Sequence, residues 1–205
     1  RDSPPKNNHE ILAYSVHYLP TRGGAELQKV ITGTSVEIDQ LQPHTNYTFY
    51  VVAYNEMSAS EHSQTVTEVT GEDVPIAAPW LTVTPVGSTL LKASWVALDP
   101  IDARGVITGY RVIYRKHGGT TEHHQEVPGN VLEYTITGLE PSQKYDVRVV
   151  GGTRMGFPAL DEREWAWITQ ITDPDRNIGA PGPPVMQIQA LNSSAILVLW
   201  QEPDL

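Results

Sequence analysis

The fold of this chain is decided by one stretch in its second half, which reads Leu139-Glu140-Pro141-Ser142-Gln143-Lys144-Tyr145. A segment that alternates apolar and polar residues follows directly, from Asp146 to Val150. A leucine, a proline two residues later and a tyrosine four residues after that form the pattern of a tyrosine corner. In such a corner the chain turns over one end of a β-sandwich, and the tyrosine hydroxyl bonds back to the backbone. The stretch therefore predicts an all-β fold.

The same pattern occurs a second time, 98 residues earlier, and reads Leu41-Gln42-Pro43-His44-Thr45-Asn46-Tyr47. A motif that recurs at about one domain length indicates two copies of one unit. We therefore divide the chain into three parts. Residues 1–74 are a unit that lacks its first two strands, residues 75–174 are a complete unit, and residues 175–205 are a linker followed by the first two strands of a further unit.

Short segments with a two-residue alternation, rich in aromatic and β-branched residues, predict the strands of each unit. In the first unit these segments are residues 11–19, 27–31, 47–54 and 64–70, and residues 35–38 lead into the first corner. In the second they are 80–84, 89–95, 110–115, 122–127, 133–137, 145–150 and 165–172, and residues 185–190 and 195–200 open the third. No helical periodicity of useful length is present, and seven short strands separated by turns predict a β-sandwich.

Three features of the second unit resemble a fibronectin type III domain: Trp95, the run from Gly105 to Arg115, and the corner that ends at Tyr145. The resemblance covers residues 78–173 fully, and residues 11–70 and 183–200 in part. It implies an all-β chain of tandem fibronectin type III sandwiches. The second unit departs from the family at Gly151-Gly152-Thr153, where the family often has Ala-x-Asn. The following loop, residues 151–163, is therefore expected to be unusual.

Within that family, the repeats resemble those of the neural immunoglobulin-superfamily receptors of the DCC, neogenin and protogenin group. This resemblance implies an extracellular segment of a single-pass receptor at the cell membrane, whose spanning segment lies outside this chain. Such a segment would serve protein–protein interaction, either by homophilic adhesion or by binding a secreted ligand. The alternatives are a passive spacer in a receptor ectodomain, the repeats of a contactin or a receptor tyrosine phosphatase, and a muscle-type or bacterial accessory module.

Composition argues against several other functions. The net charge is −10 with a pI near 5.1, whereas a nucleic-acid reader needs a basic face, so no nucleic-acid partner is expected. The absence of cysteine excludes disulfides and cysteine-ligated zinc. No nucleophile-elbow, zincin, dinucleotide-binding or phosphate-loop motif is present. His123 and His124 are adjacent in a strand and point to opposite faces. We therefore expect no enzyme, cofactor or metal site.

Two sequons, at Asn46 and Asn192, predict N-linked glycosylation. Asn46 precedes the inward-facing Tyr47, so its side chain can face solvent. Asn192 lies in a turn between two apolar runs, where a glycan is also easily accommodated.

Strand parity predicts which residues of the second unit face its core and which face outward. The inward residues are Tyr110, Val112, Tyr114, Tyr145, Val147 and Val149, and the outward ones are Arg111, Ile113, Arg115, Asp146, Arg148 and Val150. Ala166 and Ile168 are assigned inward because two indoles beside Trp95 would overfill a small core. Trp165 and Trp167 then lie outside, where an arginine over an indole contributes roughly 0.5–2 kcal/mol. The hypothesis is an arginine–tryptophan stack on this sheet.

These outward residues form the candidate interaction surface. It consists of Arg111, Ile113, Arg115, Arg148, Trp165 and Trp167 in the second unit and of Tyr50 and Val52 in the first. Trp80, just past Pro79 at the boundary, is a candidate wedge between the two units. The incomplete units also suggest self-association, in which residues 183–200 of one molecule complete residues 11–70 of another. The alternative is that the chain is a window of a longer array.

Overall fold

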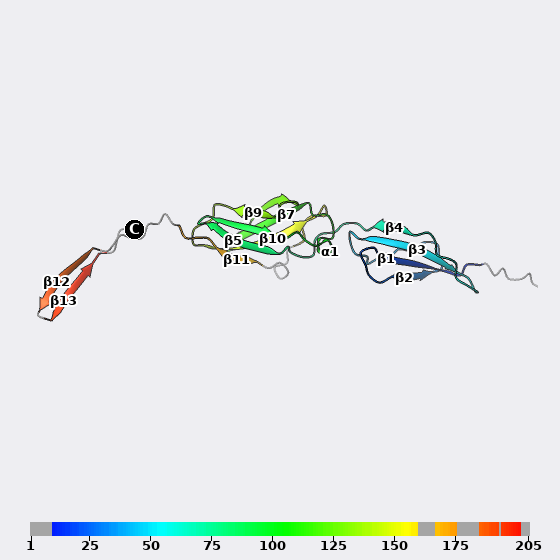
Figure 1. The fold of residues 1–205 in the computed structure, drawn as a ribbon, viewed down its shortest axis with the longest axis horizontal. Helices are drawn as coiled ribbons and strands as arrows, with labels where there is room; N and C mark the ends of the chain where they lie inside the picture. The colour runs from blue at the N-terminus through cyan, green and yellow to red at the C-terminus, as the bar shows by residue number, and fades with distance from the viewer. Residues whose placement is uncertain (1–9, 160–166, 176–184, 193, 202–205) are drawn as a thin grey trace, which may run out of the picture.

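The computed structural model describes residues 10–159, 167–175, 185–192 and 194–201, and this part of the chain is almost entirely β-structure (Figure 1). Its strands are β1 (Ala13–Pro20), β2 (Leu27–Ile31), β3 (Asn46–Tyr54), β4 (Val66–Val69), β5 (Leu81–Gly87), β6 (Leu90–Trp95), β7 (Gly109–Lys116), β8 (His123–Pro128), β9 (Glu133–Ile136), β10 (Lys144–Gly152), β11 (Ile168–Ile171), β12 (Met186–Asn192) and β13 (Ala195–Trp200). One short helix, α1 (Pro100–Ala103), interrupts them. The all-β prediction is confirmed.

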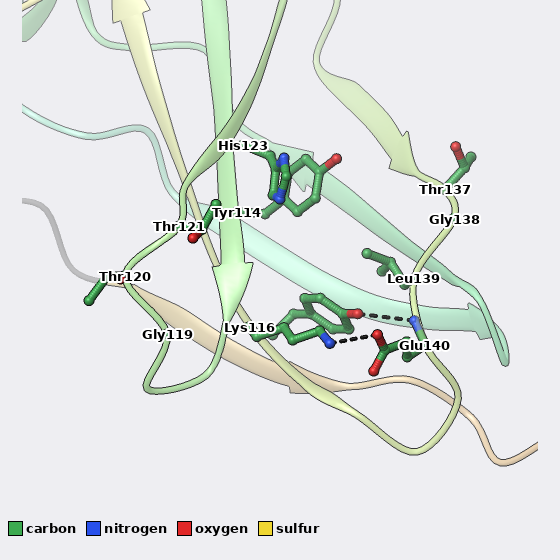
Figure 2. A pocket seen from close by; sticks show the side chains of 11 residues that line it. Tyr114, Lys116, Gly119, Thr120, Thr121, His123, Thr137, Gly138, Leu139 and Glu140 are labelled. Atoms are coloured by element: carbon green, nitrogen blue, oxygen red, sulfur yellow. Dashed lines mark hydrogen bonds and ion pairs between the residues drawn. The ribbon is translucent and has the colours of Figure 1, made fainter.

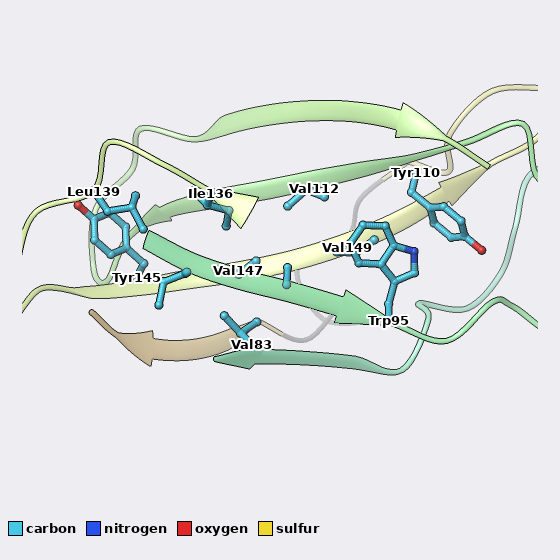
Figure 3. Close-up of a cluster of buried hydrophobic side chains, with 11 residues drawn as sticks. Val83, Trp95, Tyr110, Val112, Ile136, Leu139, Tyr145, Val147 and Val149 are labelled. Carbon is cyan, nitrogen blue, oxygen red and sulfur yellow. The ribbon is translucent and has the colours of Figure 1, made fainter. Parts of the chain in front are cut away.

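The second unit is a sandwich of two antiparallel sheets, with strand orders β11-β10-β7-β8 and β5-β6-β9. Its core lies between them (Figure 3). The residues buried there are Val83, Leu91, Ala93, Trp95, Tyr110, Val112, Ile136, Leu139, Tyr145, Val147 and Val149. Trp95 and Tyr110 meet edge to face across the two sheets, with ring centroids 5.4 Å apart. The inward assignments are therefore confirmed, with Tyr114 at the margin of the core.

The first unit consists, within residues 10–71, of a single antiparallel sheet of order β2-β1-β3-β4. The segment 35–38, which leads into the first corner, has no strand pairing. Its counterpart in the second unit is β9, which pairs with β6. Residues 10–71 contain no equivalent of β6, so the segment has no strand edge to bond to.

Both tyrosine corners form, and they are alike. The Glu140 N–H donates to the hydroxyl oxygen of Tyr145 at 3.0 Å, and the Gln42 N–H donates to that of Tyr47 at the same distance. Both rings are 5% exposed. The corner pattern therefore predicted the same bond in the two units.

The connection between β6 and β7 contains the single turn α1. Proline at the first helical position is favourable because its ring presets the helical φ angle and its missing N–H would have had no partner there. The turn ends at Arg104, which has a left-handed φ of 53°. This turn lies where the second unit meets the preceding linker, and its carbonyls accept hydrogen bonds from the linker backbone.

Candidate interaction faces

Arginine and aromatic side chains alternate on the outer face of the β11-β10-β7-β8 sheet. The guanidinium carbon of Arg148 lies 4.1 Å from the ring centroid of Trp167, and that of Arg115 lies 4.2 Å from the same ring. Arg111 lies 4.1 Å from the ring of Phe157. We refer to these five residues as the arginine–aromatic ladder. The predicted arginine–tryptophan stack is confirmed at Arg148 and Trp167, whereas Arg111 pairs with a phenylalanine that parity did not identify.

Carboxylates line the ladder and neutralise its charge. Glu126 accepts two hydrogen bonds from Arg111, at 2.6 and 3.0 Å. Glu122 lies 3.4 Å from Arg148 and 3.5 Å from Arg115. Cations stacked on ring faces and held by acids stabilise the sheet locally.

Two residues of the expected contact surface are buried on this face, whereas Arg111, Arg115 and Trp167 stay partly exposed. Ile113 is 3% exposed and Arg148 is 5% exposed. Phe157 and Trp167 pack against Ile113 and its neighbour Val150. Ile113 and Arg148 point to the outer face as parity requires, but the structure leaves them no area to contact a partner. Trp165 and Ala166 lie outside the described residues.

The two glycines that depart from the family pattern each leave space for a neighbouring side chain, and Gly152 leaves it for Phe157. A methyl group at Gly152 would lie 2.8–3.0 Å from atoms of the Phe157 ring, which is closer than real contacts allow. A methyl group at Gly151 would meet Leu98 and Ile107 at 3.0 and 3.2 Å. The missing side chain at Gly152 therefore makes room for Phe157, whereas that at Gly151 makes room for Leu98 and Ile107.

The first unit presents a different arrangement on the equivalent face. The ring of Tyr50 stacks on that of His17 at 4.6 Å and lies 5.5 Å from that of His62. Glu26 accepts a hydrogen bond from the Tyr50 hydroxyl at 2.7 Å and lies 2.6 Å from Nδ1 of His17. We refer to His17, Glu26, Tyr50 and His62 as the histidine–tyrosine cluster.

Ionisation in the cluster follows from these bonds. The hydrogen bonds from Tyr50 and His17 lower the pKa of the Glu26 carboxyl, because they favour its charged form. The same bond raises the pKa of the Tyr50 hydroxyl, since the phenol donates to an anion. Glu26 is therefore a fixed negative charge between aromatic rings. Strand parity identified Tyr50 as outward-facing, whereas Glu26 and His62 come from other segments and carried no sequence signal.

This face remains partly accessible. Tyr50 and Val52 are half-buried, and the sheet carries no counterpart of Phe157 or Trp167 among the described residues. Asn46, the first residue of β3, is exposed, so its sequon is accessible to a glycan at the end of this face. The sequon at Asn192 includes Ser193, which lies outside the described residues.

The two units meet at a linker that is bonded to the second unit. Glu72 forms an ion pair with Arg154 at 2.6 Å, accepts a bond from the Val106 N–H at 3.1 Å, and lies 3.9 Å from Nδ1 of His44 in the first unit. Asp73 forms an ion pair with Arg104. Its carbonyl accepts a hydrogen bond from the Thr153 hydroxyl at 2.9 Å. We refer to this set of contacts as the linker clamp.

The wedge role expected for Trp80 is wrong. Its side chain is 79% exposed, and it borders an open hollow with Ile76 and Ile168. Ile168 lies opposite Val147 and so shares its inner side, but it is 37% exposed at the edge of the sandwich. The acidic side chains of the linker, rather than an indole, make the junction.

A cavity of about 450 Å³ opens in the second unit near the tyrosine corner (Figure 2). Tyr114 and Tyr145 contribute to its lining, and Lys116 forms an ion pair with Glu140 at 2.5 Å at its edge. The hydrogen bond to Glu140 raises the pKa of Lys116. His123 stacks on Tyr114, with ring centroids 5.3 Å apart. These contacts hold the margin of the core in place, and they assemble no nucleophile with a base.

Two absences concern the described residues. They contain no group of three or more histidine, aspartate or glutamate side chains placed to hold a metal ion. None of their helices has the length and apolar composition needed to cross a lipid bilayer.

Two successive β-units, each with a tyrosine corner, define the class of protein to which this chain belongs. The family model of the fibronectin type III domain matches residues 2–69 and 77–162. The chain therefore belongs to the fibronectin type III family.

Among curated proteins, the chain is similar to protogenin from Homo sapiens, at 36% identity over 98% of this chain and 18% of the relative. It is also similar to neogenin from Homo sapiens, at 30% identity over 99% and 14%. A third relative is receptor-type tyrosine-protein phosphatase F from Bos taurus, at 30% identity over 98% and 10%. The chain thus spans less than a fifth of the length of these relatives.

Among solved structures, the chain resembles the FN1–FN3 domains of chicken CNTN1. The TM-score is 0.44 at 18% identity, with 78% of this chain and 56% of the other covered.

Proposed function

We propose that this chain is an extracellular protein-interaction segment of a single-pass cell-surface receptor of the protogenin and neogenin group, acting in neural development. Its relatives include a protein named as a receptor-type phosphatase, alongside protogenin and neogenin. The division into residues 1–74, 75–174 and 175–205 is part of this proposal. A sandwich fold assigns no partner by itself, so the binding face has to be argued from the exposed residues.

One observation selects that face. The histidine–tyrosine cluster is accessible, whereas the arginine–aromatic ladder covers the equivalent face of the second unit. Tyr50 and His17 provide a rigid aromatic surface around the Glu26 carboxylate. Tyrosine is enriched at interface hot spots because it offers a large apolar ring with a polar end. The proposed partner is a protein, either another copy on an opposing cell or a secreted ligand.

The test is a pair of binding measurements on the whole chain. Beads coated with the chain are scored for aggregation, and the tetramerised chain is titrated onto neural cells before and after trypsin treatment. We expect the combined substitution Tyr50→Ala and His62→Ala to weaken binding at least about tenfold, since hot-spot residues contribute 2 kcal/mol or more. Trypsin treatment should abolish the cell binding.

The matched control is Lys92→Ala with Glu133→Gln, which breaks an exposed ion pair on the opposite sheet of the second unit and should leave binding unchanged. Unchanged binding after the Tyr50 and His62 substitutions would refute the proposed face. If the unaltered chain binds neither beads nor cells, the competing function, a passive spacer within a receptor ectodomain, is favoured.

A further inference from the structure

The cavity beside the tyrosine corner lies entirely within the second unit (Figure 2). β8 and β9 are the outermost strands of their sheets, and on the other side of the sandwich β11 contacts β5. The cavity opens between the β7–β8 connection and the β9–β10 connection. Its volume of about 450 Å³ falls in the range of ~300–1,000 Å³ that is typical of small-molecule sites.

The floor and one wall of the cavity are apolar and aromatic. Leu139 and Tyr145 are 6% and 5% exposed, so they form a closed floor. Tyr114 is half-buried in the wall, and its ring stacks on the exposed His123. A methyl group at Gly138 would meet no atom within 4 Å, so the space beside this residue is open. The cavity therefore combines a closed floor with an open mouth.

The lining also carries hydroxyl groups. In the described part of the chain, two side-chain polar contacts join lining residues: the hydrogen bond of the tyrosine corner and the ion pair of Lys116 with Glu140. The hydroxyls of Tyr114, Thr121 and Thr137 take part in neither (Figure 2). Burial raises the pKa of the Tyr114 hydroxyl, which therefore stays protonated as a hydrogen-bond donor. Each of these hydroxyls can both donate and accept.

These groups select the chemical class of the ligand. An anion would need an unpaired cation, but the ammonium group of Lys116 is neutralised by Glu140. A metal ion would need several acidic or histidine ligands close together, and the described residues contain no such group. A purely apolar ligand would bury the hydroxyls without partners, which costs free energy. The lining fits a neutral molecule that has both apolar faces and many hydroxyl groups.

We propose that this cavity is a carbohydrate-binding site for neutral sugars of the kind found in the core of N-linked glycans. The C–H face of a sugar ring packs against the aromatic wall at Tyr114 and His123, and its hydroxyls bond to Thr121 and Thr137. The exposed sequon at Asn46 provides an attachment site for such glycans on copies of this chain. The site is separate from the histidine–tyrosine cluster and does not depend on it.

Titration of the isotope-labelled 205-residue chain, followed by amide NMR spectra, tests this directly. The probes are α-mannotriose and N,N′-diacetylchitobiose, which are neutral, and a heparin disaccharide, which is anionic. We expect saturable shifts of the Thr121, Gly138 and Glu140 amides with at least one neutral probe and none with the anionic one. Shifts spread over the whole chain, no response to either neutral probe, or a response to the heparin disaccharide would overturn the proposal.

Paired substitutions locate the binding. Thr121→Val with Thr137→Val keeps the shape of both exposed side chains but removes their hydroxyls, so we expect the affinity to fall at least about tenfold. The matched control is Thr82→Val with Thr84→Val, which alters two exposed threonines on β5 in the opposite sheet. This control should bind as the unaltered chain does. Equal affinities in the two double variants, with amide spectra showing both folded, contradict the assignment.

The source of the sugar is identified with a glycoprotein that carries neutral N-glycans, tested before and after enzymatic removal of those glycans. Affinity equal to that of the free probes means that the sugar alone is recognised. Tighter binding of the intact glycoprotein means that the polypeptide next to the glycan contributes as well. Both results support a carbohydrate site, provided that deglycosylation abolishes the binding. Binding that survives deglycosylation means that the polypeptide is the ligand, which refutes the proposal.

Discussion

The corner of the second unit includes a hydrogen bond from the Glu140 N–H to the Tyr145 hydroxyl, and its removal is the simplest residue-scale prediction. Tyr145→Phe keeps the buried ring but leaves the Glu140 N–H without its acceptor. We expect the free energy of unfolding to fall by about 1 kcal/mol, measured by urea denaturation. Tyr134→Phe, which alters a partly buried ring outside the corner, is the control and should cost less. Equal losses of unfolding free energy in the two variants would mean that the hydrogen bond between Glu140 and Tyr145 does not account for the effect.

A second residue-scale prediction concerns Gly152. Gly152→Ala pushes the ring of Phe157 away from the sheet, and overpacking of this kind costs about 1–3 kcal/mol. Thermal unfolding of the single variant measures that cost. Combination with Phe157→Ala should relieve the clash, so the two effects should be less than additive. Additive losses would show that the glycine is needed for another reason.

At the scale of elements, β10 is joined to its neighbours by Asp146. Its carboxylate lies 2.7 Å from Nδ1 of His117 after β7 and accepts a hydrogen bond at 2.7 Å from Thr169 on β11. Burial alone would raise the pKa of Asp146, but the bonds from Thr169 and His117 and the charges of His117 and Arg115 lower it overall. The folded sheet therefore favours the ionised form.

This pKa shift predicts a pH-dependent stability. A carboxyl whose pKa is lowered on folding stabilises the native state above its unfolded pKa, here near 3.8, and loses that effect as the pH falls through the folded value. Asp146→Asn should lower the free energy of unfolding by about 1–2 kcal/mol at neutral pH. Urea denaturation should show this difference shrinking below about pH 3.8. A difference that persists unchanged at low pH would contradict the assignment.

At the scale of the whole molecule, the linker clamp controls how the two units are oriented. Glu72 contacts both units, through Arg154 and Val106 on one side and His44 on the other. Glu72→Gln keeps the size of the side chain but removes its charge, so we expect a wider range of interdomain orientations. Small-angle scattering of the chain measures this as a broader distribution of molecular dimensions. Glu140→Gln, which breaks an ion pair inside the second unit, should leave the distribution unchanged.

The sequence by itself determined the class of fold, the two corners and the inward and outward faces of the strands. These features are local. A proline and a tyrosine at fixed spacing form a tyrosine corner, and the two-residue period of a strand assigns its side chains to one face or the other. Strand parity was therefore sufficient to place Arg148 beside Trp167.

Only the tertiary structure decided which outward residues stay accessible and what joins the units. Phe157 lies 46 residues after Arg111 in the sequence, and its ring covers the Arg111 guanidinium group. Glu26 lies in the connection between β1 and β2 and accepts a hydrogen bond from Tyr50 on β3. Such contacts depend on where loops fold back, which no local pattern encodes. For the same reason Trp80 faces solvent while Glu72 makes the junction between the units.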